Sequence, residues 1–222
     1  MRSIQRVIRG AVLACLIGLP VTAQTGKEGP AEWKPLFDGS SLEGWRETPF
    51  SGRGKVTVDE GAIVLGKGLM TGITWKGVFP KFNYEIRLEA MRVDGHDFFA
   101  GITFPVHDSF CTWINGGWGG MVVGLSSLDD LDASENDTSI RRTFQSGRWY
   151  ELRLRVTEDR IQAWIDGEAV IDAYIAARAV GLRPGETELS TPLGIASYST
   201  TARLRKLEYR PLTTDREAPA KY

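Results

Sequence analysis

The sequence predicts an all-β fold, a sandwich of two antiparallel sheets, from three observations. First, apolar and polar residues alternate with a period of two along segments such as residues 82–90 and 150–156. Second, turn signals such as Asp166-Gly167 separate the segments, at the spacing of about 8–12 residues that is typical of sandwiches and barrels. Third, only residues 173–180 have a pattern that suits a helix, and this segment is short.

The first expected strand and turn lie in the opening segment WKPLFDGSSLEGWR, residues 33–46. Trp33 and Trp45 bracket the turn Asp38-Gly39, and a buried aromatic ring removes ~150–250 Å² from water, so both indoles are expected to anchor the segment to a core. The later strands are expected, in order, at residues 56–58, 62–66, 82–90, 98–104, 121–125, 150–156, 160–166, 193–199 and 203–210.

The first 23 residues have the pattern of an export signal. Arg2, Arg6 and Arg9 form its basic region, residues 11–19 form an apolar stretch too short to span a bilayer, and Val21-Thr22-Ala23 fits a cleavage site. An alternative is a lipoprotein signal with Cys15 acylated. Cleavage would leave a linker at 24–32, one domain at 33–212 and a tail at 213–222. The mature protein is expected to be secreted or periplasmic, with no membrane contact.

The charge and cysteine content of the chain limit the partners and cross-links that it can have. Residues 1–23 hold three arginines and no acidic residue, so the remainder carries 24 basic against 28 acidic side chains. This mild acidity argues against nucleic acid, which requires a basic patch. Cys111 is the only cysteine after residue 23, so the mature chain is expected to have no internal disulfide.

Residues 111–120, CTWINGGWGG, interrupt the strand pattern and are a candidate binding loop. Exposed indoles beside flexible glycines would suit a sugar, whose C–H face stacks on an aromatic ring. Trp113, Asn115 and Trp118 are therefore candidate substrate-binding residues. The alternative is that both rings fill the core and the glycines only turn the chain.

An acidic segment, residues 126–139, follows this loop. Asp129, Asp132 and Glu135 are candidate ligands for a hard divalent cation such as calcium, because carboxylate and carbonyl oxygens are what such ions prefer. The segment lacks the central glycine and terminal glutamate of an EF-hand loop. No cofactor is certain on this pattern, and a solvated acidic loop is the alternative.

The two histidines each precede an aspartate, and a histidine beside a carboxylate suits a general base near neutral pH. We consider His96, Asp97 and His107 as candidate catalytic residues. The expected strand 98–104 would separate the two pairs by about 23 Å, at ~3.3 Å per residue. At most one pair therefore belongs to any one pocket.

Four segments resemble the 3-keto-disaccharide hydrolase (DUF1080) family: LFDGSSLEGW at 36–45, DFFAGITFPV at 97–106, GGWGGMVVGLSS at 116–127 and DASEND at 132–137. Residues 149–167 also resemble the late hairpin of concanavalin A-like jelly rolls. The resemblance implies a concanavalin A-like jelly-roll sandwich. Glucanases of this fold carry Glu-x-Asp-x-x-Glu, whereas residues 135–140 lack the last glutamate, which disfavours the two-carboxylate mechanism.

The family resemblance implies cleavage of glycosidic bonds in 3-keto-sugars or related glycans. A ketone at C3 acidifies the C2 proton, so one base and one group that stabilises the enolate let the C1 oxygen leave. On this hypothesis His96 or His107 is the base, the acidic segment holds a cation or donates a proton, and Trp113 and Trp118 form the sugar platform. A non-catalytic carbohydrate-binding or cell-surface module is the competing interpretation, and a ligand-free structural envelope protein is a third.

Overall fold

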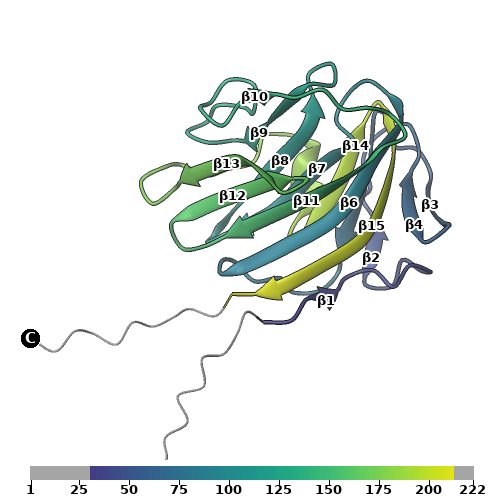
Figure 1. The fold of residues 1–222 in the computed structure, drawn as a ribbon, viewed down its shortest axis with the longest axis horizontal. Helices are drawn as coiled ribbons and strands as arrows, with labels where there is room; N and C mark the ends of the chain where they lie inside the picture. Colours follow the sequence, from purple (N-terminus) through teal and green to yellow (C-terminus); the bar gives the residue numbers. More distant parts are fainter. Residues whose placement is uncertain (1–30, 213–222) are drawn as a thin grey trace, which may run out of the picture.

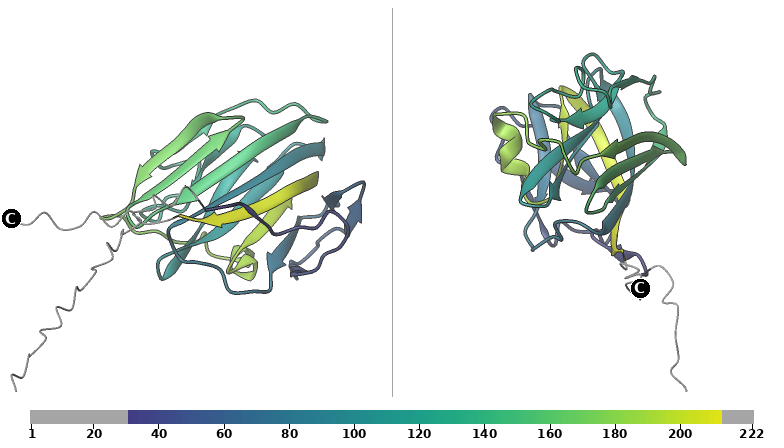
Figure 2. Two further views of the ribbon diagram at one scale, coloured as in Figure 1. Left: turned by 60° about the horizontal axis from the view of Figure 1, so that its bottom comes forward. Right: turned by 90° about the vertical axis from the view of Figure 1, so that its left-hand side faces the viewer.

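The computed structural model describes residues 31–212, which form two stacked antiparallel sheets (Figures 1 and 2). The strands of sheet A are, in spatial order, β13 (Glu168–Tyr174), β12 (Arg160–Ile165), β11 (Trp149–Val156), β6 (Tyr84–Gly95), β15 (Thr200–Pro211), β4 (Ala62–Leu65) and β3 (Val56–Asp59), with β1 (Lys34–Pro35) also paired to β15. The strands of sheet B are β10 (Ile140–Arg141), β9 (Val122–Ser126), β8 (Ser109–Gly117), β7 (Ala100–Val106), β14 (Gly194–Tyr198), β5 (Met70–Trp75) and β2 (Trp45–Glu47).

The predicted signal sequence, most of the linker 24–32 and the tail 213–222 lie outside the described residues. Within residues 31–212, none of the helical structure is long and apolar enough to cross a membrane. The only helical element in that range is a single 3-10 turn, η1 (Glu186–Ser190).

The core fills the space between the sheets, and the alternation in the sequence explains why. In β11, Tyr150, Leu152, Leu154 and Val156 are buried while the residues between them face outward. Phe99, Phe144 and Tyr150 pack at ring-centroid distances of 4.9–6.0 Å near one end of the core. The all-β sandwich prediction is confirmed, because the described chain forms two stacked antiparallel sheets. Period-two burial is clear in β11 and β12 of sheet A, whereas β7 and β9 of sheet B are buried on both faces.

The opening segment closes one edge of the sandwich. The indole N–H of the buried Trp45 donates to the Leu36 carbonyl at 2.7 Å, which locks the turn between them. Amide and hydroxyl hydrogen bonds from Ser40 and Ser41 lower the pKa of Asp38 to about 2. Pairing of β1 with β15 places the two ends of the described chain side by side (Figure 1).

Two local predictions are wrong. Residues 173–180 form no helix, because alternation continues from β13, with Ala173 and Ile175 buried and Tyr174 exposed. Residues 111–117 are not a loop but the second part of β8. The glycines at 116–117 carry a bulge in its pairing with β9, and the turn to β9 starts only at Trp118.

Candidate functional site

A groove of about 360 Å³ lies on the outer face of sheet B. Its floor consists of the residues that alternate with the core side chains of the central strands, namely Gly101, Thr103, Thr112, Ile114 and Ala196. The Thr103 and Thr112 hydroxyls lie 2.9 Å apart, in a hydrogen bond across β7 and β8. The floor is therefore smooth and uncharged, with hydroxyl groups at its centre.

A glycine on β7 keeps this floor open. A Cβ atom at Gly101 would approach the Phe98 ring to 3.1 Å, closer than most such contacts. The glycine therefore lets the Phe98 ring lie flat over the strand.

Aromatic rings form the rim of the groove. Phe98 and Tyr198 pack with ring centroids 5.8 Å apart, and both line the groove. Trp118 lines it as well and is 42% exposed, at the turn where its backbone φ is +47°. Partly exposed rings beside a hydroxyl-lined floor are suited to binding a sugar ring.

Charged side chains approach the groove from three connections. Asp97 accepts hydrogen bonds from the Phe98 amide (2.8 Å) and the Gly119 amide (3.2 Å). Asp132 accepts from the Ser126 hydroxyl at 2.5 Å and pairs with Arg183 at 2.8 Å.

The fourth charged residue belongs to η1. Glu186 accepts from the Ser51 amide through both carboxylate oxygens, and hydrogen bonding from Ser51 keeps its pKa below the usual range. Three carboxylates and one guanidinium therefore line the groove.

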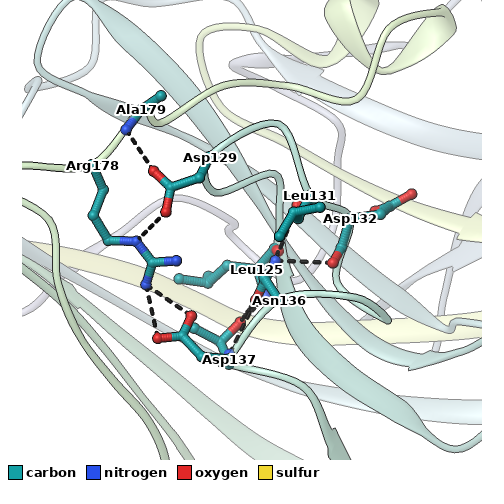
Figure 3. Close-up of polar contacts among 9 residues, drawn as sticks. Leu125, Asp129, Leu131, Asp132, Asn136, Asp137, Arg178 and Ala179 are labelled. Atoms are coloured by element: carbon teal, nitrogen blue, oxygen red, sulfur yellow. Dashed lines mark hydrogen bonds and ion pairs between the residues drawn. The ribbon is translucent and has the colours of Figure 1, made fainter.

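The acidic segment is held against the connection that carries Arg183 (Figure 3). Arg178 pairs with Asp129 at 2.8 Å and with Asp137 at 2.8 Å. Hydrogen bonds from the Arg178 side chain and then the Ala179 amide keep the pKa of Asp129 below its usual range. Backbone hydrogen bonds between Ser127 and Gly181, in both directions, extend this contact. Arg178 thus joins the two walls that present Asp132 and Arg183 to the groove.

A buried asparagine shapes the acidic segment itself. The Asn136 amide donates to the carbonyls of Leu125, Leu131 and Asp132 at 2.7–3.0 Å (Figure 3). Its Oδ1 accepts from both the amide and the hydroxyl of Thr138. These bonds tie the acidic segment to the end of β9.

The residues predicted to hold calcium have other partners. Asp129 and Asp132 pair with arginines, and Glu135 accepts a 3.3 Å hydrogen bond from the Asp132 amide. Among residues 31–212, no three His, Cys, Asp or Glu side chains are grouped closely enough to hold a metal ion. Guanidinium groups pair with two of these carboxylates, and calcium binding by the segment stays a prediction.

Of the three predicted substrate-binding residues, only Trp118 lines the groove. Trp113 and Asn115 are 0% exposed and face the core, so neither offers a surface to a ligand. The Asn115 amide donates to the Ala100 carbonyl at 3.0 Å. The expectation that Trp113 and Asn115 contact substrate is wrong, because both belong to the inward set of β8.

The candidate catalytic residues separate as the strand length predicts. His96 and His107 flank opposite ends of β7, both are exposed, and neither lines the groove. His107 Nε2 lies 2.7 Å from the Glu158 carbonyl oxygen and borders a different hollow of about 400 Å³. The expectation that one histidine enters the sugar pocket is therefore not met by this groove, whereas Asp97 does line it.

Sequence reasoning missed Arg183, Glu186 and the aromatic pair Phe98 and Tyr198. Arg183 comes from the long connection after β13 and is 51 positions from Asp132, so no local pattern links them. Tyr198 shares the outward parity of Ala196 in β14, and this parity was an available signal. Phe98 precedes β7 and has the parity of the inward residues of that strand, so alternation gave no signal for it.

Comparison with known proteins identifies a family and the fold. The model of the 3-keto-alpha-glucoside-1,2-lyase-like domain matches residues 32–210. No curated protein matches the chain.

Several solved structures share the concanavalin A-like jelly roll. Crh5 transglycosylase in complex with NAG has a TM-score of 0.55 at 15% identity, covering 84% of this chain and 86% of that one. Carbohydrate binding module CBM66 from Bacillus subtilis has a TM-score of 0.51 at 12% identity, covering 77% and 98%. SCLam, a non-specific endo-beta-1,3(4)-glucanase from family GH16, has a TM-score of 0.52 at 12% identity, covering 82% and 92%. At these identities the likeness concerns the fold.

Proposed function

This chain belongs to the 3-keto-alpha-glucoside-1,2-lyase-like domain family, and we propose that it cleaves glycosidic bonds of 3-keto-sugars or related glycans in the groove on sheet B. The observation that carries the proposal is the convergence of Trp118, Asp97 and the Asp132–Arg183 pair on one concavity. An aromatic platform, a carboxylate and a cation are what elimination from a 3-keto-sugar requires of a protein.

Asp97 is the proposed base. Its carboxylate is held by two backbone amides, beside Trp118. In the proposed step it takes the C2 proton, and the C–H electrons form an enolate with the C3 ketone. The enolate then re-forms the ketone and a C1–C2 double bond as the C1 oxygen departs and takes a proton from water. The hydroxide left by that water adds to C1, and the proton held by Asp97 returns to C2, which completes hydrolysis and restores the carboxylate.

Arg183 is the proposed stabiliser of the developing negative charge. Its side chain is 61% exposed at the groove and held by Asp132 at 2.8 Å. A positioned guanidinium lowers the barrier because charge on the C3 oxygen is greatest in the transition state. Trp118 would bind the sugar face, which orients C2 toward the base.

One observation favours a second candidate, a non-catalytic carbohydrate-binding module. Each groove carboxylate already accepts hydrogen bonds or pairs with an arginine, and both histidines lie elsewhere. Such a protein would bind glycans without releasing product. Residues 1–23 support export for either candidate, and N-terminal sequencing of protein secreted by an expression host tests this, with Gln24 expected first.

The test is product release from a 3-keto-disaccharide, followed by chromatography. Asp97→Asn should reduce turnover about 10²–10⁴-fold, the usual contribution of a general base. Asp94→Asn is the matched control, since Asp94 is 70% exposed and pairs with Lys67 outside the groove. His96→Ala and His107→Ala should retain wild-type turnover. Glycan binding without product, even with added Ca²⁺ or Mn²⁺, would leave only the binding module.

A further inference from the structure

We propose that the groove selects uncharged sugars and rejects acidic ones, and that Asp132 sets this preference by neutralising Arg183. The inference rests on the proposed function only in taking the groove as a sugar site. It does not depend on whether bound sugar is cleaved.

Negatively charged side chains outnumber positively charged ones in the groove. Asp97, Asp132 and Glu186 line it, against Arg183 as the single basic residue. A uronate or sulfate that enters would therefore meet more negative than positive charge. Such repulsion is strong at short range, because the groove walls lower the effective dielectric constant below that of water.

The charge of Arg183 is already partly balanced by a carboxylate. Asp132 Oδ2 lies 2.8 Å from its guanidinium. Asp132 is itself fixed, since its Oδ1 accepts from the Ser126 hydroxyl at 2.5 Å and from the Ala133 amide at 2.8 Å. Its side chain is only 15% exposed. An acidic ligand therefore gains less from Arg183 than it would from an unpaired guanidinium, and it cannot easily move a carboxylate that three groups already hold.

The rest of the surface suits neutral hydroxyl groups. The floor contains the paired hydroxyls of Thr103 and Thr112, and beside them the apolar surfaces of Ile114 and Ala196 on either side of Gly101. A hydroxymethyl group loses little when it contacts such a surface, whereas a carboxylate loses its hydration without a partner. The discrimination is therefore expected at any sugar position that lies near the Asp132–Arg183 pair.

The test compares methyl α-glucoside with methyl α-glucuronide, which differ only at C6, in NMR titrations of the full chain. Wild-type protein should bind the glucoside at least about tenfold more tightly at ~20 mM salt. The difference should shrink at about 1 M salt, where the screening length falls to ~3 Å. Tighter or equal binding of the glucuronide would overturn the inference.

Asp132→Asn is the decisive variant, because it keeps the shape and frees Arg183. Its affinity for the glucuronide should rise about tenfold relative to the glucoside. Asp130→Asn is the control, since Asp130 is an exposed carboxylate of the same segment that does not line the groove. An equal change for both sugars in Asp132→Asn would contradict the proposal.

Arg183→Gln gives a second measurement in case Asp132→Asn folds poorly, which its melting temperature will reveal. Removing the cation leaves Asp132 unpaired, so discrimination against the glucuronide should increase; an unchanged ratio would count against the proposal. If neither sugar binds wild-type protein, the sugar site itself is wrong and the inference falls with it. If both bind equally, only the inference fails.

Discussion

Replacing each of two tryptophans that stand five positions apart should have opposite consequences. Trp113 is 0% exposed and lies on the inward face of β8, whereas Trp118 is 42% exposed at the groove. Truncating a fully buried indole costs about 3–5 kcal/mol, from lost burial and the cavity left behind. For a domain of this size each kcal/mol lowers the melting temperature by roughly 2–4 °C, so Trp113→Ala should melt about 6–20 °C below wild type.

Trp118→Ala should leave the free energy of unfolding within about 0.5 kcal/mol of wild type, as surface changes do. It should weaken sugar binding, because an aromatic contact of this kind is worth about 0.5–1.5 kcal/mol, or roughly two- to twelvefold in affinity. Urea denaturation measures the first quantity and glycan titration below the melting temperature measures the second. Trp113→Phe, which keeps a buried ring, should lose less stability than Trp113→Ala.

The opposite pattern would refute this reasoning. If Trp118→Ala kept full affinity, the rim would not be the sugar platform. If Trp113→Ala kept its melting temperature and lost affinity, the inward assignment of β8 would be wrong, and with it the register that places Thr112 and Ile114 in the groove.

Three further outcomes are expected. Arg178→Gln should speed hydrogen exchange in residues 127–139, because it removes the ion pairs of Arg178 with Asp129 and Asp137. Wild-type protein should show the same change as pH falls below about 4, since Asp129 has a depressed pKa and its contribution to stability is lost as it protonates. Slow exchange in both cases would show that Arg178 does not hold the acidic segment. Burial raises the pKa of Cys111 to about 12, so thiol reagents at pH 8 should label it only after denaturation, and rapid labelling of native protein would contradict its placement. Glu85 is fully buried between Arg155 and Arg210, so Glu85→Ala should lower the free energy of unfolding by about 3 kcal/mol, measured in urea, whereas the exposed control Glu151→Ala should change it little.

Strand assignment succeeded where alternation was complete and failed where other signals dominated. Residues 82–90 and 150–156 alternate without interruption in the sequence; residues 84–90 lie in β6, which begins two residues later than expected, and 150–156 lie in β11. Residues 111–117 alternate too, with Cys111, Trp113 and Asn115 inward, but the glycines of the segment suggested a loop. The bulge and turn that follow separate the environments of the two indoles, and neither can be located from spacing alone.

Some groove residues could be predicted from their sequence neighbours, whereas others are placed there by contacts between distant segments. Asp97 and Trp118 could be proposed from the sequence because their neighbours are distinctive. Arg183 could not, because its partner Asp132 is chosen by the packing of two connections that Arg178 and backbone hydrogen bonds join. A histidine beside an aspartate suggested a general base, whereas His96 and His107 lie in the turns before and after β7 and neither lines the groove.

The amino-acid sequence by itself determined a two-sheet sandwich and the family, since period-two alternation and short motifs are properties of neighbouring residues. Only the tertiary structure decided which residues form the site. Strand register, one bulge and the arginine pairs choose the face on which each side chain lies, and these depend on contacts between segments as far apart as residues 97 and 198.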